Sequence, residues 1–511
     1  MIQSSLNSFK QSRSELSLAA SLSSEEELEQ YKEEEENDND NENNNSLPPP
    51  LIDYYNRDDY FKYNITKQFP SLPAYEVSQT TTLPKIYAFV FPQFHREKLN
   101  DRIWGEGFTD WDNLKLAPLK NRLGQTIIRP STSNNELGYY DYASYETRQR
   151  QGDLAKKYGI DGFIYHHYWF YDENNNNTGP TLGLPLAKLL EDGEPNIKFC
   201  LNWANVKWGM KWMSGTKVRS DFQPVTGVLQ QQYFPNYNDS RIVEHYLWLR
   251  QFFHHPNYIK IDGRPVFMIY EKKPGAIPVL QRMIELAKED GFPGLYLSVG
   301  FTTIHRHLYS HIDATGIPVE RFYKVNLNRD VFDRYLAYPR PTDWFCQPMQ
   351  TPDWCIPNHN NTVGGSNNNN EYYPLLEIPG IISSFDNTPR RNFEDATIVG
   401  AKDNNNNGST SAEPNQVLER FRQNVFHTMY YELCCTKEQK MNKGFMKKKG
   451  IRSKISKDDN FIVINATNEW AEGMALEPSN VYGKEILSII NTTKHQLKEK
   501  DCTAQEPLKL P

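Results

Sequence analysis

Short runs of apolar, β-branched and aromatic residues recur along the chain from Leu83 onward, and each is typical of a buried strand. Eight runs can be recognised, and the sixth has the weakest pattern. They read KIYAFVF, GFIYHHYWF, IKFCLNW, PVFMIY, LYLSVG, DATGIPV, IISSF and FIVINA. Because these runs are apolar almost continuously, they predict a parallel sheet whose faces are covered by helices.

Amphipathic helical patterns separate several of these runs. The clearest span residues 145–158, 241–253, 276–290 and 416–433. Alternating strands and helices predict an α/β fold, here a (β/α)8 TIM-like barrel. A doubly wound open sheet is the alternative. No strand is followed by a G-x-G-x-x-G or G-x-x-x-x-G-K-[ST] turn, which weakens a nucleotide-binding interpretation.

The first 80 residues have a different composition. Residues 1 to about 50 are rich in Ser, Glu and Asn and contain too little apolar surface to offset the entropy of ordering. We therefore expect a disordered, acidic, low-complexity tail and lead-in over 1–80, a barrel over 81–500 and a C-terminal tail over 501–511. Asn-rich tracts between patterned segments predict surface-loop insertions at 174–177, 367–370 and 404–407.

Composition and charge narrow the class of partner. The chain has 511 residues, 38% of them hydrophobic, which is enough for a large core but does not fix the number of domains. Eleven acids and one lysine lie between Glu25 and Glu42, so this stretch has a charge of −10. The net charge of the chain is −7, so the remaining residues together carry +3. No strongly basic face therefore favours a nucleic-acid partner.

Cysteine usage and hydropathy bear on the compartment. The six cysteines are scattered without a C-x-x-C pair, which suits a reducing environment. The N-terminal SELSLAASLSS is too polar for a secretory signal peptide, and no window holds eighteen consecutive apolar residues. We expect a cytoplasmic protein without a transmembrane segment, although the compartment is left open.

Polar and aromatic side chains follow the predicted strands, where the chemistry of a β/α barrel takes place. Aromatic faces stack on sugar rings, and amides, imidazoles and guanidinium groups bind hydroxyls. Two carboxyl groups can divide the work of proton donor and nucleophile or base. The candidate site residues are Gln93, His95, His166, Tyr168, Trp169, Asn202, Trp203, Asn205, Tyr270, Asp386, Arg390, Asn468, Glu469, Trp470 and Glu472.

Each candidate also has a structural interpretation. Neighbouring His166 and His167 face opposite sides of a strand, so one of them can be a packed core histidine. The tryptophans can belong to the core, and Arg390 can belong to a solvated turn. Glu469 and Glu472 can cap a helix, but their place at the end of the clearest strand favours function. No H-E-x-x-H or comparable spacing predicts a metal.

Seven motifs, in order between about Lys85 and Lys500, resemble the WbsX-like, glycoside hydrolase family 99-like proteins. They are FPQFH, WGEGFTDW, ELGYYD, YGIDGFIYHHYWF, CLNWAN, FDNTPRR and NEWAEGMALEP. The resemblance implies a (β/α)8 barrel that acts on an oligosaccharide or polysaccharide with neither metal nor organic cofactor. Bacterial WbsX-like members often occur in surface-polysaccharide assembly and carry a glycosyltransferase label, whereas family 99 contains endo-acting α-mannosidases.

The resemblance also implies roles for the two glutamates. Family 99 enzymes have a Glu-Trp-His-Glu motif, and its catalytic glutamates match Glu469 and Glu472. The first would help the substrate's own 2-hydroxyl attack the anomeric carbon, and the second would protonate the departing oxygen and then activate water. Ala471 replaces the histidine, and Asp110 and Val206 also depart from the usual residues, so the sugar specificity is not implied.

Three hypotheses follow. The leading one is a retaining, endo-acting glycoside hydrolase on an α-linked glycan, with Trp203 stacking on the sugar and Arg390 holding an anionic substituent. The second is a glycosyltransferase or transglycosylase of polysaccharide biosynthesis, for which the D-x-D at Asp110 to Asp112 is weak support. The third is a catalytically silent glycan-binding protein.

Overall fold

The computed structural model places most of the chain beyond Thr82. It describes residues 83–133, 136–171, 179–209, 228–271, 273–301, 331–337, 376–391, 393–394, 396–398, 414–434 and 459–498. The predicted N-terminal tail, the three Asn tracts and the C-terminal tail lie outside the described residues. So does the sixth predicted strand, DATGIPV.

Eight strands pair side by side in parallel. They are β1 (Lys85–Val90), β2 (Gly162–Phe170), β4 (Lys198–Trp203), β8 (Arg264–Ile269), β9 (Tyr296–Phe301), β10 (Arg334–Ala337), β11 (Leu376–Ile382) and β12 (Phe461–Asn465). Their order is β1-β12-β11-β10-β9-β8-β4-β2, and β2 pairs again with β1. The prediction of a mixed α/β fold with a parallel sheet is confirmed. Six of these strands coincide with predicted runs, β11 overlaps the run IISSF only at Ile381 and Ile382, and β10 was missed.

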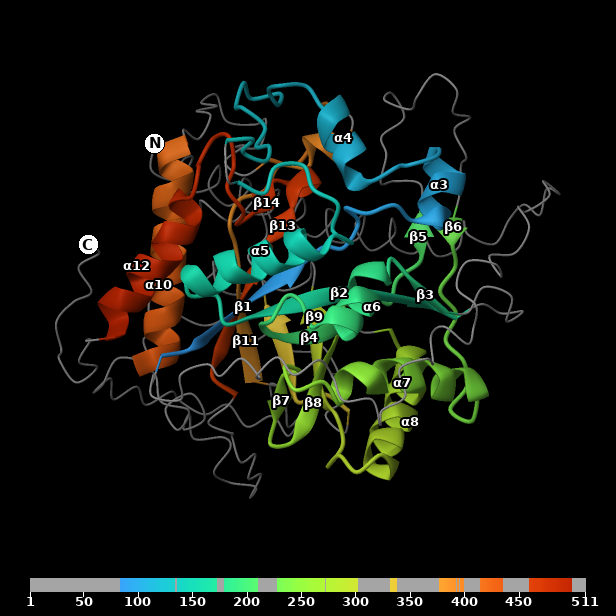
Figure 1. Ribbon diagram of the computed structural model, residues 1–511. Helices are drawn as coiled ribbons and strands as arrows, with labels where there is room; N and C mark the ends of the chain where they lie inside the picture. The colour runs from blue at the N-terminus through green and yellow to red at the C-terminus, as the bar shows by residue number, and fades with distance from the viewer. Residues whose placement is uncertain are drawn as a thin grey trace, which may run out of the picture. The chain divides into compact units, whose positions relative to one another are not determined.

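Helices connect and cover these strands (Figure 1). They are α3 (Lys98–Trp104), α4 (Asp110–Leu116), α5 (Tyr145–Lys157), α6 (Leu184–Asp192), α7 (Ser240–Phe253), α8 (Ala276–Glu289), α10 (Pro414–Cys434) and α12 (Glu485–Lys498). The four predicted helices match α5, α7, α8 and α10 to within two residues. In the described part of the chain, no helix combines the length and apolar character needed to cross a membrane.

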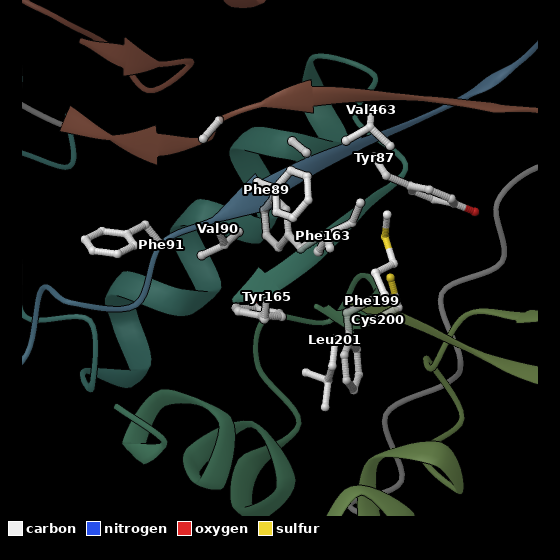
Figure 2. Close-up of a cluster of buried hydrophobic side chains, with 14 of the residues drawn as sticks. Tyr87, Phe89, Val90, Phe91, Phe163, Tyr165, Phe199, Cys200, Leu201 and Val463 are labelled. Atoms are coloured by element: carbon white, nitrogen blue, oxygen red, sulfur yellow. The ribbon is translucent and has the colours of Figure 1, made fainter. Parts of the chain in front are cut away.

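Apolar side chains of the strands form the core. The strands β1 and β12 are buried over most of their length, as their uninterrupted apolar sequences predict. Figure 2 draws side chains from β1, β2, β4 and β12 in this core. Glycine is needed where strands meet closely, because a Cβ on Gly162 would lie 2.6 Å from the carbonyl oxygen of Lys198.

Short elements are added at the strand ends. A β-hairpin of β13 (Asn468–Glu469) and β14 (Met474–Ala475) follows β12, with the 3-10 turn η9 (Trp470–Glu472) at its tip. A second 3-10 turn, η6 (Thr388–Arg390), follows β11. Both turns contact α4, and Figure 1 shows α4 and the hairpin at the same end of the sheet. This end carries the carboxyl termini of the parallel strands.

Candidate active site

The β13–β14 hairpin presents the two candidate glutamates. Glu469 ends β13 and Glu472 ends the turn, so only two residues separate them. The turn closes at Gly473, whose φ of 67° lies in the left-handed region that glycine adopts without strain. A Cβ at this position would also lie 2.7 Å from the backbone nitrogen of Asp386. The sequence W-A-E-G therefore fits a tight turn packed against the segment after β11.

Contacts on both sides hold this hairpin. The Asn468 side chain accepts a hydrogen bond from the Phe91 N–H (2.8 Å) and donates one to the Phe91 carbonyl (3.0 Å), at the end of β1. On the other side, the Ser384 hydroxyl donates to the Gly473 carbonyl, and the Asp386 N–H donates to the Glu472 carbonyl (2.8 Å). The glutamates are thus fixed to neighbouring strands through the backbone of their turn.

Arg390 brings three carboxyl groups together. Its Nη2 lies 2.6 Å from Glu469 Oε1 and 2.9 Å from Asp110 Oδ2, and its Nη1 lies 2.9 Å from Glu472 Oε1. The guanidinium also lies over the ring of Phe91, 5.0 Å from its centroid. We call Arg390, Asp110, Glu469 and Glu472 the carboxylate cluster. Because adjacent nitrogens of one guanidinium hold the two glutamates, their carboxyl groups face the same small volume.

Burial within the carboxylate cluster is uneven. The side chains of Arg390 and Asp110 are 4% and 1% exposed, whereas that of Glu472 is 31% exposed. Burial raises the pKa of Glu469 well above its usual range, the negative charges of Glu472 and Asp110 raise it further, and Arg390 opposes the shift. One guanidinium faces three carboxyl groups, so the cluster favours retention of a proton by one of them.

Side chains from β2, from β4 and from the residue that follows β8 lie beside the cluster. The Asn202 amide lies 3.1 Å from His166 Nδ1, and the His166 ring stacks on Phe89. Burial lowers the pKa of His166 to about 4, so this imidazole is neutral at pH 7. Burial and the nearby charge of Glu469 raise the pKa of Tyr168, whose hydroxyl therefore stays protonated. The ring centroids of Tyr270 and His166 lie 6.4 Å apart.

The other face of the same strands packs against α7. His167 lies 2.8 Å from His245 through their Nε2 atoms, and Trp169 stacks on the same His245 ring at 4.4 Å. Trp203 is fully buried and donates its indole N–H to the Trp169 carbonyl (3.0 Å). The expectation that Trp203 stacks on a sugar is wrong. Alternation along the strands turns Trp169 and Trp203 toward the helix and away from the carboxylate cluster.

The remaining candidates serve the scaffold around the cluster. Asn205 exchanges two hydrogen bonds with the backbone of Glu271 (2.7 and 2.8 Å), and the Gln93 carbonyl accepts from the Asp110 N–H (2.9 Å). The buried His95 ring contacts the Pro92 carbonyl. The Asp386 carboxylate accepts bonds from the Thr388 N–H and hydroxyl and so caps η6. Arg390, expected to hold an anionic substituent, is instead engaged by three carboxyl groups of the chain itself.

The family model described as glycosyltransferase WbsX matches residues 86–428 and 433–490. The chain belongs to the glycosyltransferase WbsX family. The resemblance inferred from the seven motifs is therefore confirmed.

Sequence relatives and solved structures also match the chain. Two proteins of Xanthomonas campestris pv. campestris called WxcX are 23% identical over 422 residues and 24% over 409, each covering 78% of this chain. The chain spans about half the length of these curated relatives, 49% and 48%. A GH99 endo-alpha-mannosidase from Bacteroides thetaiotaomicron is 13% identical, covering 81% of this chain and 97% of its own, with a TM-score of 0.38. A glycoside hydrolase-like protein is 15% identical, covering 86% and 98%, with a TM-score of 0.40.

Three further residues lie at this candidate site of the WbsX-family chain; sequence reasoning missed the contacts of Asp110 and Glu477, and it noted Trp208 only as an indole shortly after the third strand. Asp110 stood out only as a departure within the WGEGFTDW motif, yet it binds Arg390. Trp208 packs edge-on against Tyr168, with ring centroids 5.2 Å apart. It therefore lies on the face of β2 that carries Tyr168, beside the carboxylate cluster. Glu477 contacts Trp470. In the described ranges, no group of three or more His, Cys, Asp or Glu side chains has an arrangement that could hold a metal ion.

Proposed function

We propose that this chain is a glycan-acting enzyme, a retaining and endo-acting glycoside hydrolase for an α-linked glycan, with Glu469 and Glu472 as its catalytic pair. The observation that carries the proposal is the carboxylate cluster. Two carboxyl groups of one tight turn share the guanidinium of Arg390 at the carboxyl ends of the parallel strands. Most glycoside hydrolases use two such carboxyl groups, which flank the scissile glycosidic bond.

The surroundings of the two glutamates support different roles. Glu469 is buried against Arg390, which orients its carboxyl group and opposes the rise of its pKa, and a raised pKa suits a base that takes up the proton of the attacking substrate hydroxyl. Glu472 is the more exposed of the pair and can approach the glycosidic oxygen as proton donor, after which it activates water. Arg390 binds both glutamates and is a positioning residue that holds them on one side of the substrate.

The strand pairings support a barrel for this catalytic unit. β1 pairs with β12 on one side and with β2 on the other, and the intervening strands are all parallel. A ring of eight parallel strands in this order is what a (β/α)8 barrel requires, and the pairings support that proposal. The carboxylate cluster then lies at the barrel end that carries the chemistry in such enzymes.

Sugar binding is assigned to the residues beside the cluster. The hydroxyl of Tyr168 and the ring of His166 come from one strand, and Asn202 from the next. A neutral imidazole, a protonated phenol and an amide can each donate and accept hydrogen bonds, as sugar hydroxyls require. Tyr270 and Trp208 supply aromatic faces for the sugar ring.

Glycosyl transfer is the second candidate, because the family is described as a glycosyltransferase family. The D-x-D at Asp110 to Asp112 offers little for a nucleotide sugar. Asp110 binds Arg390 and the Asn113 amide (2.9 Å), and Asp112 accepts from the Thr109 N–H (2.9 Å). A transferase reaction would therefore use the same glutamate pair to pass a glycan to an acceptor hydroxyl.

Two assays separate these reactions. The purified chain is screened on an oligosaccharide array for cleavage, and separately incubated with nucleotide sugars and acceptor glycans. The first product of any cleavage is then followed by proton NMR of its anomeric signal. We expect cleavage without a nucleotide sugar and a product that first keeps the substrate's anomeric configuration. Turnover that requires a nucleotide sugar would overturn the hydrolase proposal, and an inverted product would overturn the retaining mechanism.

A further inference from the structure

Glu477 lies buried behind the candidate catalytic turn and accepts hydrogen bonds from three neutral groups. The Gln151 amide lies 2.6 Å from Oε1, the Tyr140 hydroxyl 2.9 Å from Oε2, and the Trp470 indole nitrogen 3.0 Å from Oε2. Glu477 itself is 3% exposed. A buried carboxyl group is costly unless donors satisfy it, so this position has been shaped around an acidic side chain.

One of these donors belongs to the turn itself. Trp470 lies between Glu469 and Glu472 in the chain, is 1% exposed, and uses its indole N–H on Glu477. A second donor continues toward β1, because the Tyr140 hydroxyl also lies 3.1 Å from the Asn468 amide. Glu477 is therefore connected to both chain neighbours of Glu469: to Asn468 through the Tyr140 hydroxyl, and to Trp470 directly.

Other contacts hold the two ends of the turn, and Glu477 holds the indole between the two glutamates. The Asn468 side chain accepts from the Phe91 N–H at one end, and the Gly473 carbonyl accepts from the Ser384 hydroxyl at the other. Between these ends, the Trp470 indole donates a side-chain hydrogen bond to Glu477, on the side of the turn away from Arg390. Arg390 attracts the two glutamates from one side, and Glu477 holds the indole on the other.

We propose that Glu477 is a positioning residue, which through the Trp470 indole sets the separation and direction of the two glutamate side chains. The inference rests on the proposed function, since it assigns Glu477 a part in that reaction. A glutamine would serve this place less well. It has one acceptor oxygen for three donors, and its NH2 group, itself a donor, would face one of the donor N–H or O–H groups.

The test compares Glu477→Gln and Trp470→Phe with a matched control, Tyr296→Phe. Tyr296 is also a buried tyrosine that donates to a buried carboxylate, Asp459, over 2.8 Å, but at the other end of the strands. Each variant is checked for its unfolding midpoint. The indole N–H signals are recorded by nitrogen-15 NMR, with the Trp470 signal assigned from its loss in Trp470→Phe. Values of kcat and KM are measured on the array glycan that the wild type cleaves fastest.

We expect Glu477→Gln to move the Trp470 indole signal and to lower kcat by about 10²-fold, because a displacement of about 1 Å in a catalytic group has that effect. The value of KM should stay within about two-fold of the wild type. Trp470→Phe should show the same changes in kcat and KM. The kcat of the double variant should be no lower than that of the less active single variant, because both substitutions break one interaction. Tyr296→Phe should leave kcat and the Trp470 signal unchanged.

Two failures are distinguishable. If the wild type cleaves no glycan, the proposed function falls and the positioning role falls with it. If the wild type cleaves but folded Glu477→Gln and Trp470→Phe keep its kcat, only the positioning role is overturned. An unmoved Trp470 signal in Glu477→Gln likewise overturns it. Should Glu477→Gln not fold, Trp470→Phe alone decides by the same kcat criterion.

Discussion

Two buried arginines at opposite ends of the parallel strands have different partners. Arg334 begins β10 and pairs with Asp459 at 2.6 Å, just before β12, and Asp459 also accepts from the Tyr296 hydroxyl. Arg390 follows β11 and is surrounded by three carboxyl groups. The first arrangement joins strand starts through an arginine–aspartate ion pair, whereas the second gathers three carboxyl groups around one arginine at the strand ends.

The difference separates a structural ion pair from the cluster that we propose as catalytic. A buried arginine and aspartate compensate each other's charge and hold the strand starts together. Three carboxyl groups around one guanidinium compete for the same cation, so a proton can be held and released within the cluster. Excess carboxyl groups at the strand ends are therefore evidence for acid–base chemistry, and a buried arginine alone is not.

Removing each arginine is expected to have the largest effect on stability. Arg390→Met and Arg334→Met should each lose about 3–5 kcal/mol of unfolding free energy at pH 7, because each leaves buried carboxylates without a cation. Arg390→Met should regain part of this as the pH falls to about 5, since uncompensated carboxyl groups take up protons. Urea unfolding at both pH values measures the effect. An Arg390→Met protein as stable as the wild type at pH 7 would contradict the charge account.

The pH dependence of stability should reveal the buried Glu477. Burial raises its pKa to about 7, whereas the unfolded chain releases that proton near pH 4.5. The folded state therefore keeps the proton longer, and its contribution is complete below about pH 4.5 and lost as the pH rises to about 7. The loss is on the order of 3 kcal/mol. Glu477→Gln should remove this decline in unfolding free energy with pH, whereas the control Tyr296→Phe should retain it. A pH profile of Glu477→Gln that matches the wild type would refute the assignment.

Two tyrosines give the smallest contrast. Tyr296→Phe removes a buried hydrogen bond and should lower the unfolding free energy by about 1 kcal/mol without changing KM. Tyr168→Phe removes a hydroxyl next to the carboxylate cluster and should raise KM by about ten-fold, with little loss of stability. Thermal unfolding and initial rates measure both. Equal effects of the two substitutions on KM would remove Tyr168 from the sugar site.

The sequence predicted the sheet better than the site. Apolar runs such as FIVINA mark buried strands by local composition, so six of the eight strands were found, and β11 in part. β10 was missed because its four residues, RYLA, are too short to carry a pattern. Period-two alternation would have turned Trp203 and Asn202 to opposite faces, but it does not say which face is covered by α7.

Long-range pairing explains the other misses. Asp110 and Arg390 are 280 positions apart, and their contact depends on how two loops meet at the strand ends. Glu477 lies seven positions after Trp470, and only the return of the β13–β14 hairpin brings them together. The glutamate pair could be found because both members lie in one short motif.

The rate of glycan cleavage by Glu469→Gln and Glu472→Gln tests the central claim most directly, with Asp459→Asn as the control for loss of a buried carboxylate. We predict that each glutamine variant, folded as the wild type, lowers kcat on the array glycan by about 10³-fold or more, which is about 4 kcal/mol of barrier. Asp459→Asn should lower stability but retain kcat. Near-wild-type cleavage by both glutamine variants would contradict the account.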